Sequence, residues 1–359
     1  MSNDLERYLV QKCTEKGNAI RATLELFPLC NMNCQMCYVR HSKEEAEALG
    51  GIKPVSYWKE FIPEMKKMGI LFVTLIGGEP FLYPGIEELY EELYKNGFYI
   101  SLTTNATMLA KGLPKWLSKR VPRYVTVSLY GGSDATYEIV TGDRNGFMKT
   151  IQGIENLLQA GIPVKLNYGV LEENRQDLEK IVQLKEKYQL PLLATAYCFP
   201  HTRKQVKESE CYKRLSPMEC AKAEWDILRL SMPEKYHQKL KYFSEENFSQ
   251  NTTQHTQSIS CHAGRSTFWI TWQGKMAICG TMKSFTVEAI PGKLNECWEE
   301  LKNQVKAIRL SEKCAKCEKR EICHVCASIM EAETGSVEKC PEYLCKITDE
   351  MIRLSKELV

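Results

Sequence analysis

Three cysteines near the start of the chain have a spacing that is typical of a metal-binding loop. Cys30, Cys34 and Cys37 form a C-x3-C-x2-C pattern directly after a short apolar segment. Three thiolates from one loop can bind three irons of a 4Fe–4S cluster and leave the fourth iron open to a small molecule. A structural zinc site needs four ligands, and this loop offers three. The alternative, three reduced cysteines that cluster by chance, is disfavoured by their position after a predicted strand.

A second group of eight cysteines lies in the last hundred residues. It consists of Cys261, Cys279, Cys314, Cys317, Cys323, Cys326, Cys340 and Cys345. Five further cysteines are isolated, and we expect most of them to be buried or free thiols: Cys13, Cys198, Cys211, Cys220 and Cys297. Disulfide frameworks stabilise small secreted domains that lack a core, whereas this chain has 359 residues, 16 of them cysteine, and long apolar segments. Metal ligation in a reducing cytoplasm is therefore favoured over disulfide bridging.

The composition excludes several classes of protein. Hydrophobic residues make up 43% of the chain and charged residues 26%, so the chain can bury a core and is not disordered. The formal net charge of +3 gives no reason to expect nucleic acid as a partner. No apolar run is long enough to cross a membrane, and the first ten residues lack the apolar core of a signal peptide. We therefore expect a cytoplasmic protein.

The elements that must position the first cysteine loop alternate between strand and helix patterns. The predicted strands are Ile20–Phe27, Phe72–Ile76, Tyr99–Thr103, Tyr124–Ser128, Val164–Gly169 and Leu192–Ala196. The predicted helices are Tyr57–Met68, Ile86–Tyr94, Pro114–Lys119, Phe147–Ala160, Asp177–Tyr188 and Pro217–Leu230. Six such units over about 200 residues predict an α/β fold with a partial (β/α)6 TIM-like barrel. The polar motifs follow the strands, where chemistry collects in parallel sheets.

The chain divides into four predicted segments. Residues 1–19 form an N-terminal extension, 20–235 the barrel, 236–258 a polar linker and 259–359 a small cysteine-rich domain. The last segment has few long periodic runs before a closing helix near Thr348–Leu358. A segment that cannot fill a core with side chains needs metal to fold.

The first cysteine loop and the loop after the second predicted strand together resemble the radical SAM superfamily. Tyr38 supplies the aromatic residue beside the last cysteine of the signature, and Gly77-Gly78-Glu79-Pro80 is similar to the family's GGEP motif. The resemblance implies a cluster on the three cysteines and S-adenosylmethionine as cofactor, its amino group held at GGEP. Two glycines also allow a close approach of backbone carbonyls, and Glu79 offers charge complementarity to an ammonium.

Weaker correspondences follow along the chain. Thr104-Asn105 resembles the family's TN motif, and Ser128 and Arg144 match residues that contact the carboxylate of the ligand in relatives. An arginine fork suits a carboxylate, whereas the alternative is a solvated surface arginine. Many relatives have an acid after this Ser-Leu pair, and here Tyr130 takes its place. The resemblance therefore implies cofactor contacts at Asn105, Ser128 and Arg144.

The second cysteine group resembles the SPASM extension of radical SAM enzymes, which implies two auxiliary 4Fe–4S clusters and three clusters in all. The resemblance covers Cys261-x12-Gly274-x4-Cys279 and the later cysteines, although Cys323-x2-Cys326 has two intervening residues instead of three. It implies an inner cluster on Cys261, Cys279 and Cys326, with Cys340 as fourth ligand or an open iron. It implies an outer cluster on Cys314, Cys317, Cys323 and one late cysteine, for which we favour Cys345 over Cys340. The alternative is a pair of zinc sites. The expected architecture is thus a partial barrel followed by a small cysteine-rich iron–sulfur domain.

The resemblance implies an oxygen-sensitive oxidoreductase in which a 5′-deoxyadenosyl radical removes hydrogen from a peptide. We expect a maturase of a ribosomally made peptide that forms a thioether or carbon–carbon crosslink or epimerises a residue. The alternatives are a small-molecule radical dehydrogenase, a sulfatase-maturing enzyme and, as a non-enzyme, a zinc-binding interaction module. Gly280 follows Cys279 where sulfatase-maturing relatives have an aspartate, which disfavours that activity.

Cys198 and Tyr130 are the candidate catalytic side chains, because a thiol just past the sixth predicted strand suits a hydrogen donor. A flavodoxin or ferredoxin is the expected reductant. Only about 20 residues precede the first predicted strand, so we expect any leader recognition to use a separate leader-binding protein.

Overall fold

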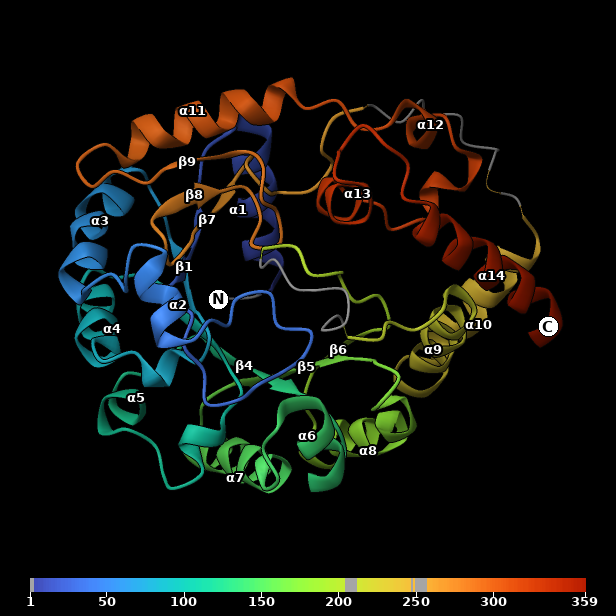
Figure 1. Ribbon diagram of the computed structural model, residues 1–359, viewed down its shortest axis with the longest axis horizontal. Coiled ribbons are helices and arrows are strands. Elements are labelled where there is room, and N and C mark those ends of the chain that lie inside the picture. Colours follow the sequence, from blue (N-terminus) through green and yellow to red (C-terminus); the bar gives the residue numbers. More distant parts are fainter. Residues whose placement is uncertain (1–2, 204–211, 247, 249–256) are drawn as a thin grey trace.

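The computed structural model describes residues 3–203, 212–246, 248 and 257–359, and its centre is a parallel sheet (Figure 1). The first six strands are β1 Arg21–Glu25, β2 Phe72–Ile76, β3 Tyr99–Thr104, β4 Tyr124–Leu129, β5 Val164–Gly169 and β6 Leu192–Thr195. Each pairs in parallel with the next, so strand order follows chain order. The predicted α/β fold is confirmed, and all six strands fall within one or two residues of their predicted ends.

Helices surround the sheet on its outer side (Figure 1). The predicted ones are α3 Val55–Lys67, α4 Ile86–Lys95, α5 Lys115–Lys119, α7 Gly146–Gln159, α8 Leu178–Tyr188 and α9 Pro217–Ser231. At the start of α9 the Ser216 side chain accepts from the Glu219 N–H, and the Glu219 carboxylate accepts from the Ser216 N–H. This reciprocal pair, with Pro217 in the first turn, explains why the helix begins there.

The burial of β4 shows how the sheet separates core from site. Val125, Val127 and Leu129 are buried, whereas the alternate residues Thr126 and Ser128 are only half-buried. Successive side chains of a strand point to opposite faces, so one face packs into the hydrophobic core. The other face, with Ser128, lines the interior of the partial barrel.

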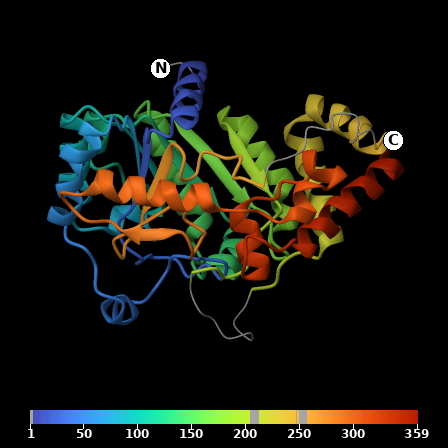
Figure 2. The same cartoon turned by 90° about the horizontal axis from the view of Figure 1, so that it is seen from above.

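Among the described residues before β5, three helices were not predicted from the sequence: α1 Asn3–Lys16, α2 Lys43–Ala48 and α6 Asp134–Thr141. α1 lies at one end of the barrel and α2 at the opposite end (Figure 2). α2 follows the cysteine loop, so its position marks the end at which the strands stop and the polar motifs gather.

The cysteine-rich segment continues the sheet, which the division into separate domains did not anticipate. β7 Thr267–Ile270 pairs in parallel with β1, and β8 Lys275–Ala277 and β9 Thr286–Glu288 add two antiparallel strands. The full order is β6-β5-β4-β3-β2-β1-β7-β8-β9. Backbone hydrogen bonds therefore fix the start of this segment against the first strand of the barrel.

The expectation of few long periodic runs before a closing helix is wrong for α11 Leu294–Ala307, whereas the closing helix itself is present as α14 Glu342–Leu358. α11 buries Leu294, Trp298 and Leu301, and α14 begins earlier than expected. α12 Glu312–Ala315 and α13 Ala327–Thr334 lie between them. α14 packs against α9 and α10, which brings the end of the chain back to the β6 side of the barrel (Figure 1).

The predicted linker 236–258 begins inside a helix. α10 Pro233–Ser244 covers its first part and buries Leu240 and Phe243. Residues 247 and 249–256 of the linker lie outside the described residues, as does Cys211. In the part of the chain that the structure describes, no helix combines the length and the apolar character needed to cross a membrane.

Candidate functional site

The cysteine loop and the Gly77-Gly78 segment are fitted closely against each other. The Gly78 N–H donates to the Phe27 carbonyl oxygen at 2.8 Å, and the Glu79 N–H donates to that of Leu29 at 2.9 Å. A Cβ on Gly77 would lie 2.6 Å from the Phe27 oxygen, and one on Gly78 would overlap the Leu29 carbonyl. Only glycine permits this approach, so the two glycines fix the segment leading to Cys30 against the end of β2.

Glu79 is fully buried and ties the end of β2 to the end of β3. Its two carboxylate oxygens accept from the Thr104 hydroxyl at 2.8 and 2.9 Å, and one accepts from the Asn105 N–H at 2.9 Å. Burial raises the pKa of Glu79 to about 7, against the opposing effect of these hydrogen bonds. With 0% of its surface exposed, the carboxyl positions the loop here rather than facing a ligand. A direct contact between Glu79 and an ammonium would therefore need a rearrangement of the loop.

Several N–H groups donate to the sulfurs of the cysteine loop. The Asn105 side-chain amide donates to the Cys30 sulfur at 3.7 Å, and the Met32 backbone N–H donates to the same sulfur at 3.4 Å. The Arg40 N–H donates to the Cys37 sulfur at 3.3 Å. Such donors stabilise thiolates, which is the form that binds iron, and they tune the potential of iron–sulfur clusters. The loop therefore fits the ligand set of a cluster.

The three thiols of this loop influence one another electrostatically. Burial raises the pKa of Cys30 to about 11, and it raises the pKa of Cys34 further, with the neighbouring thiolates adding to the effect. Thiols in such surroundings stay protonated unless a positive charge compensates them, and iron supplies that charge. The pKa of Tyr130 is raised by burial and by Cys34, Cys30 and Cys37, which places this phenol beside the loop. The residue that departs from the family pattern is thus at the site.

The other predicted site residues differ in how near they lie to the cysteine loop. Ser128 lies near the end of β4, paired in register with Asn167. Cys198, like Met36 of the cysteine loop and Tyr130, packs against one cluster of buried side chains, and its thiol donates to the Val170 carbonyl at 3.7 Å. The structure therefore places Cys198 in the same apolar cluster as a residue of the cysteine loop.

Arg144 is not brought into the interior of the barrel. Its side chain is 79% exposed and pairs with Glu138 at 3.1 Å. The end of α6, three residues before Arg144, does contact the cysteine loop, because the Asn33 N–H donates to the Thr141 carbonyl at 2.7 Å. In this structure Arg144 has the position of a surface arginine.

A buried ion pair that sequence reasoning missed lies next to Tyr38. Arg203 donates from its two terminal nitrogens to the two oxygens of Glu25, at 2.6 and 2.7 Å. It also donates to the Gly280 carbonyl at 3.2 Å, and its guanidinium lies 5.9 Å from the centre of the Tyr38 ring. Glu25 is fully buried at the end of β1. Glu25 takes one of the polar positions in the alternating strand pattern, so the pattern alone carried no signal that this acid is buried with a partner.

The eight later cysteines fall into two groups in space. Electrostatic interactions link Cys326 with Cys279 and Cys261, the three residues expected at the inner cluster. Cys340 lies 3.3 Å from Cys345, sulfur to sulfur, and interacts with Cys314, while Cys323 interacts with Cys345. Cys340 is therefore placed with the expected outer ligands rather than as a fourth inner one. Cys317 is exposed, and its N–H donates to the Cys314 carbonyl oxygen at 3.4 Å.

No three His, Cys, Asp or Glu side chains among the described residues are arranged to hold a single metal ion. The cysteines of a 4Fe–4S cluster each bind a different iron, so their sulfurs surround a cluster instead of converging on one ion. The three cysteine groups are therefore defined by the closeness of their thiols to one another and, in the first group, by the N–H groups that donate to the sulfurs.

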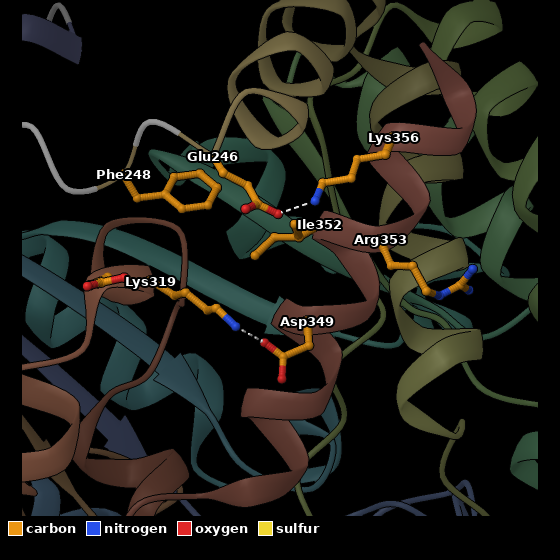
Figure 3. A pocket seen from close by; sticks show the side chains of 8 residues that line it. Glu246, Phe248, Lys319, Asp349, Ile352, Arg353 and Lys356 are labelled. Atoms are coloured by element: carbon orange, nitrogen blue, oxygen red, sulfur yellow. Dashed lines mark hydrogen bonds and ion pairs between the residues drawn. The ribbon is translucent and has the colours of Figure 1, made fainter.

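Two cavities lie near the cysteine-rich segment. One, of about 350 Å³, is lined by Thr202, Thr281 and Glu331 among others. The other, of about 340 Å³, lies against α14 (Figure 3). In the second, Lys319 pairs with Asp349 at 2.5 Å and Lys356 pairs with Glu246, so these charges are already compensated (Figure 3).

Comparison with known proteins finds a family match for the part of the chain that contains the first cysteine loop. Residues 24–184 match the model of the radical SAM superfamily, and this stretch includes the cysteine loop, Gly77, Gly78 and Asn105. The chain is 23% identical over 324 residues to the AdoMet-dependent heme synthase of Methanosarcina barkeri, covering 87% of this chain and 92% of that protein. It is 27% identical over 190 residues to the sporulation killing factor maturation protein SkfB of Bacillus subtilis, covering 51% of this chain and 41% of SkfB.

Among solved structures, Streptococcus suis SuiB bound to S-adenosylmethionine has a similar fold, with a TM-score of 0.65. The match covers 96% of this chain and 83% of SuiB at 16% sequence identity, so the likeness concerns the fold.

Proposed function

We propose that this chain, which carries a radical SAM domain at residues 24–184, is a peptide-modifying radical SAM enzyme. The observation that carries the proposal is the fit of Gly78 against Leu29, because it sets the two family motifs side by side at the ends of β1 and β2. The proposed cofactors are S-adenosylmethionine, one 4Fe–4S cluster on Cys30, Cys34 and Cys37, and two auxiliary 4Fe–4S clusters in a SPASM-like segment.

The chain's own residues have distinct proposed roles. Cys30, Cys34 and Cys37 would hold the cluster, which when bound and reduced would supply the electron for cleavage of S-adenosylmethionine. Gly77 and Gly78 would offer backbone carbonyls to the amino group of the cofactor, and Ser128, on β4, would bind its carboxylate. Asn105 holds the cysteine loop through the Cys30 sulfur and the Asn31 side chain, at 3.7 and 3.0 Å. Positioning of this kind lowers the barrier by fixing the reacting groups before reaction.

Water exclusion falls to an apolar cluster beside the loop. Met36 and Tyr130 pack there with the buried side chains of Val140, Leu171 and Tyr212. A dry environment protects a reactive radical from side reactions. Cys198 belongs to the same cluster, so its thiol is the candidate hydrogen donor if the reaction is an epimerisation.

A peptide substrate is supported by the nature of the similar proteins. SkfB is named as a maturation protein of a killing factor, and SuiB has been crystallised with the precursor peptide SuiA, at a TM-score of 0.64 to this chain. We propose a maturase that forms a thioether or carbon–carbon crosslink or epimerises a residue. Its proposed partners are a flavodoxin or ferredoxin as reductant and a separate leader-binding protein, in the cytoplasm.

A second candidate is a radical enzyme acting on a small molecule. The match to the heme synthase covers 92% of that protein, against 41% of SkfB, and so extends beyond the shared domain. A sulfatase-maturing activity is disfavoured, because Gly280 offers no side chain as base and its carbonyl is used by Arg203.

Anaerobic purification and assay test the proposal. We expect about twelve irons and twelve sulfides per chain, and 5′-deoxyadenosine on addition of dithionite and S-adenosylmethionine. The matched control is the triple variant C30A/C34A/C37A, which should retain the later cysteine groups and produce no 5′-deoxyadenosine. Zinc without sulfide in the purified wild-type protein would contradict the proposal and favour a zinc-binding module. Product mass spectrometry with the peptide encoded next to the gene, compared with porphyrin substrates, separates the two substrate classes.

A further inference from the structure

The cavity of about 350 Å³ lies directly beside the inner cysteine group. It is enclosed by His201 and Thr202 after β6, by residues 281–284 after β8 and by α13. The Thr281 hydroxyl is 3.3 Å from the Cys279 sulfur and 2.5 Å from the Ser328 hydroxyl. One wall of the cavity is therefore in contact with a residue expected to hold an auxiliary cluster.

Two polar atoms at this cavity are buried and have no hydrogen-bond partner among the residues that the structure describes. Thr202 is 4% exposed, and its hydroxyl is one of them. Oε2 of Glu331 is likewise buried and unpartnered, although the other carboxylate oxygen accepts from the Ser284 N–H at 2.9 Å. Unsatisfied buried polar groups are costly and uncommon in folded proteins. Two of them at one cavity indicate a ligand that supplies the missing partners.

The walls of the cavity are held in place from outside it. Arg203 follows Thr202 directly and is fixed by Glu25 and by the Gly280 carbonyl. Glu331 is oriented by its bond to the Ser284 backbone. A site whose groups are fixed before binding loses less entropy when the ligand arrives.

The chemistry of the two free atoms suits a peptide unit. Oε2 of Glu331 can accept from a backbone N–H, and the Thr202 hydroxyl can donate to a backbone carbonyl. One cationic side chain, Lys283, and one anionic side chain, Glu331, line the cavity, so their formal charges cancel. We propose that this cavity is an anchoring subsite for a main-chain amide segment of the peptide substrate, next to the inner cysteine group. The inference rests on the proposed function, in that the substrate is a peptide.

Binding of a defined diamide to the reconstituted holoenzyme tests the subsite. The probe is N-acetyl-alanyl-alanine N-methylamide, titrated anaerobically by calorimetry. Thr202→Val removes one neutral hydrogen bond and should weaken binding roughly fivefold, whereas Thr202→Ser keeps the hydroxyl and should bind as the wild type does. Glu331→Gln can keep the bond to Ser284 but turns the second oxygen into a donor, and should weaken binding roughly tenfold or more.

Matched controls are Thr286→Val on β9 and Glu338→Gln, an exposed residue beyond α13, and both should bind the probe like the wild type. Unchanged affinity in Thr202→Val and Glu331→Gln would overturn the proposal, as would failure of the wild type to bind the diamide. Binding of propylammonium instead, lost in Glu331→Gln, would also overturn it by revealing an ammonium site.

Failure of the subsite and failure of the proposed function give different results. Wild-type enzyme that forms 5′-deoxyadenosine but ignores the diamide refutes the subsite alone. Enzyme that binds the diamide in a Thr202-dependent way but never cleaves S-adenosylmethionine refutes the proposed function.

Discussion

Arg203 and Glu25 form a two-point ion pair that is almost completely shielded from solvent, with N···O distances of 2.6 and 2.7 Å. The two residues are 178 positions apart, and their side chains are 9% and 0% exposed. The Trp269 indole N–H donates to the same carboxylate at 3.2 Å, and Arg203 also donates to the Gly280 carbonyl. The pair therefore joins the end of β1, the segment after β6 and the residue that follows Cys279.

Breaking this pair from one side should destabilise the fold strongly. Arg203→Met leaves a buried carboxylate without its cation, and we expect a loss of about 3–5 kcal/mol in the free energy of unfolding. The double variant E25L/R203M removes both charges and should recover much of that loss. Denaturant unfolding of the reduced apoprotein measures both. Arg144→Met, at an exposed pair, is the control and should change stability by less than about 1 kcal/mol. Equal losses of stability in Arg203→Met and Arg144→Met would contradict the prediction.

A methyl group on Gly78 should displace the cysteine loop. The new Cβ would overlap the Leu29 carbonyl and lie 2.8 Å from the Pro28 oxygen, and backbone atoms cannot rotate away as a side chain can. We expect Gly78→Ala to lose about 1–3 kcal/mol of stability and to reduce 5′-deoxyadenosine formation severely. Gly169→Ala is the matched control, because its Cβ would meet only the Cys198 sulfur at an ordinary 3.7 Å. Normal activity in Gly78→Ala would show that the close approach is not needed.

Glu79 should make the stability of the apoprotein depend on pH. Burial raises its pKa from 4.5 to about 7, so the folded state favours the protonated form. The contribution of protonated Glu79 to the free energy of unfolding is fully present below about pH 4.5 and is lost as the pH rises through 7. This loss is on the order of 3 kcal/mol. We expect the unfolding free energy of the wild type to fall more steeply between pH 5 and 8 than that of Glu79→Gln. Parallel pH profiles would argue against a buried, protonated Glu79.

The grouping of the late cysteines can be read from iron content. Cys340 lies with Cys345, so the variant C340S/C345S should lose one cluster, or about four irons. Cys326 belongs to the other group. Provided that each single change releases its own cluster, the variant C326S/C340S should therefore lose two clusters, or about eight irons. The reverse pattern, eight irons lost in the first variant and four in the second, would place Cys340 with the inner ligands.

Replacement of Cys198 should separate radical formation from hydrogen donation to the substrate. Its thiol shares an apolar cluster with Tyr130, and burial raises its pKa to about 11, so it stays a neutral S–H at neutral pH. If the enzyme epimerises its substrate, Cys198→Ala should still form 5′-deoxyadenosine but should stop releasing the epimerised peptide. Cys220→Ala, a buried cysteine on α9, is the control. Full turnover by Cys198→Ala would remove this thiol from the mechanism.

The sequence by itself determined the local features of this protein. The six strands of the barrel and six of the helices between Ile20 and Leu230 follow from hydrophobic periodicity, which is a property of neighbouring residues. The cysteine loop and the glycine pair could be recognised for the same reason, because their chemistry depends on spacing within a few residues. Their meeting at one end of the sheet follows from the parallel order of β1 and β2.

The tertiary structure alone decided which distant residues meet. The parallel pairing of β7 with β1, the ion pair of Arg203 with Glu25 and the neighbourhood of Cys340 each join segments whose contact no local pattern encodes. The structure also decided the surroundings of residues that match family motifs. Glu79 is enclosed by Thr104 and Asn105, whereas Arg144 points to solvent. Such contacts depend on how the whole core packs, and packing is a sum over the chain rather than a property of any one motif.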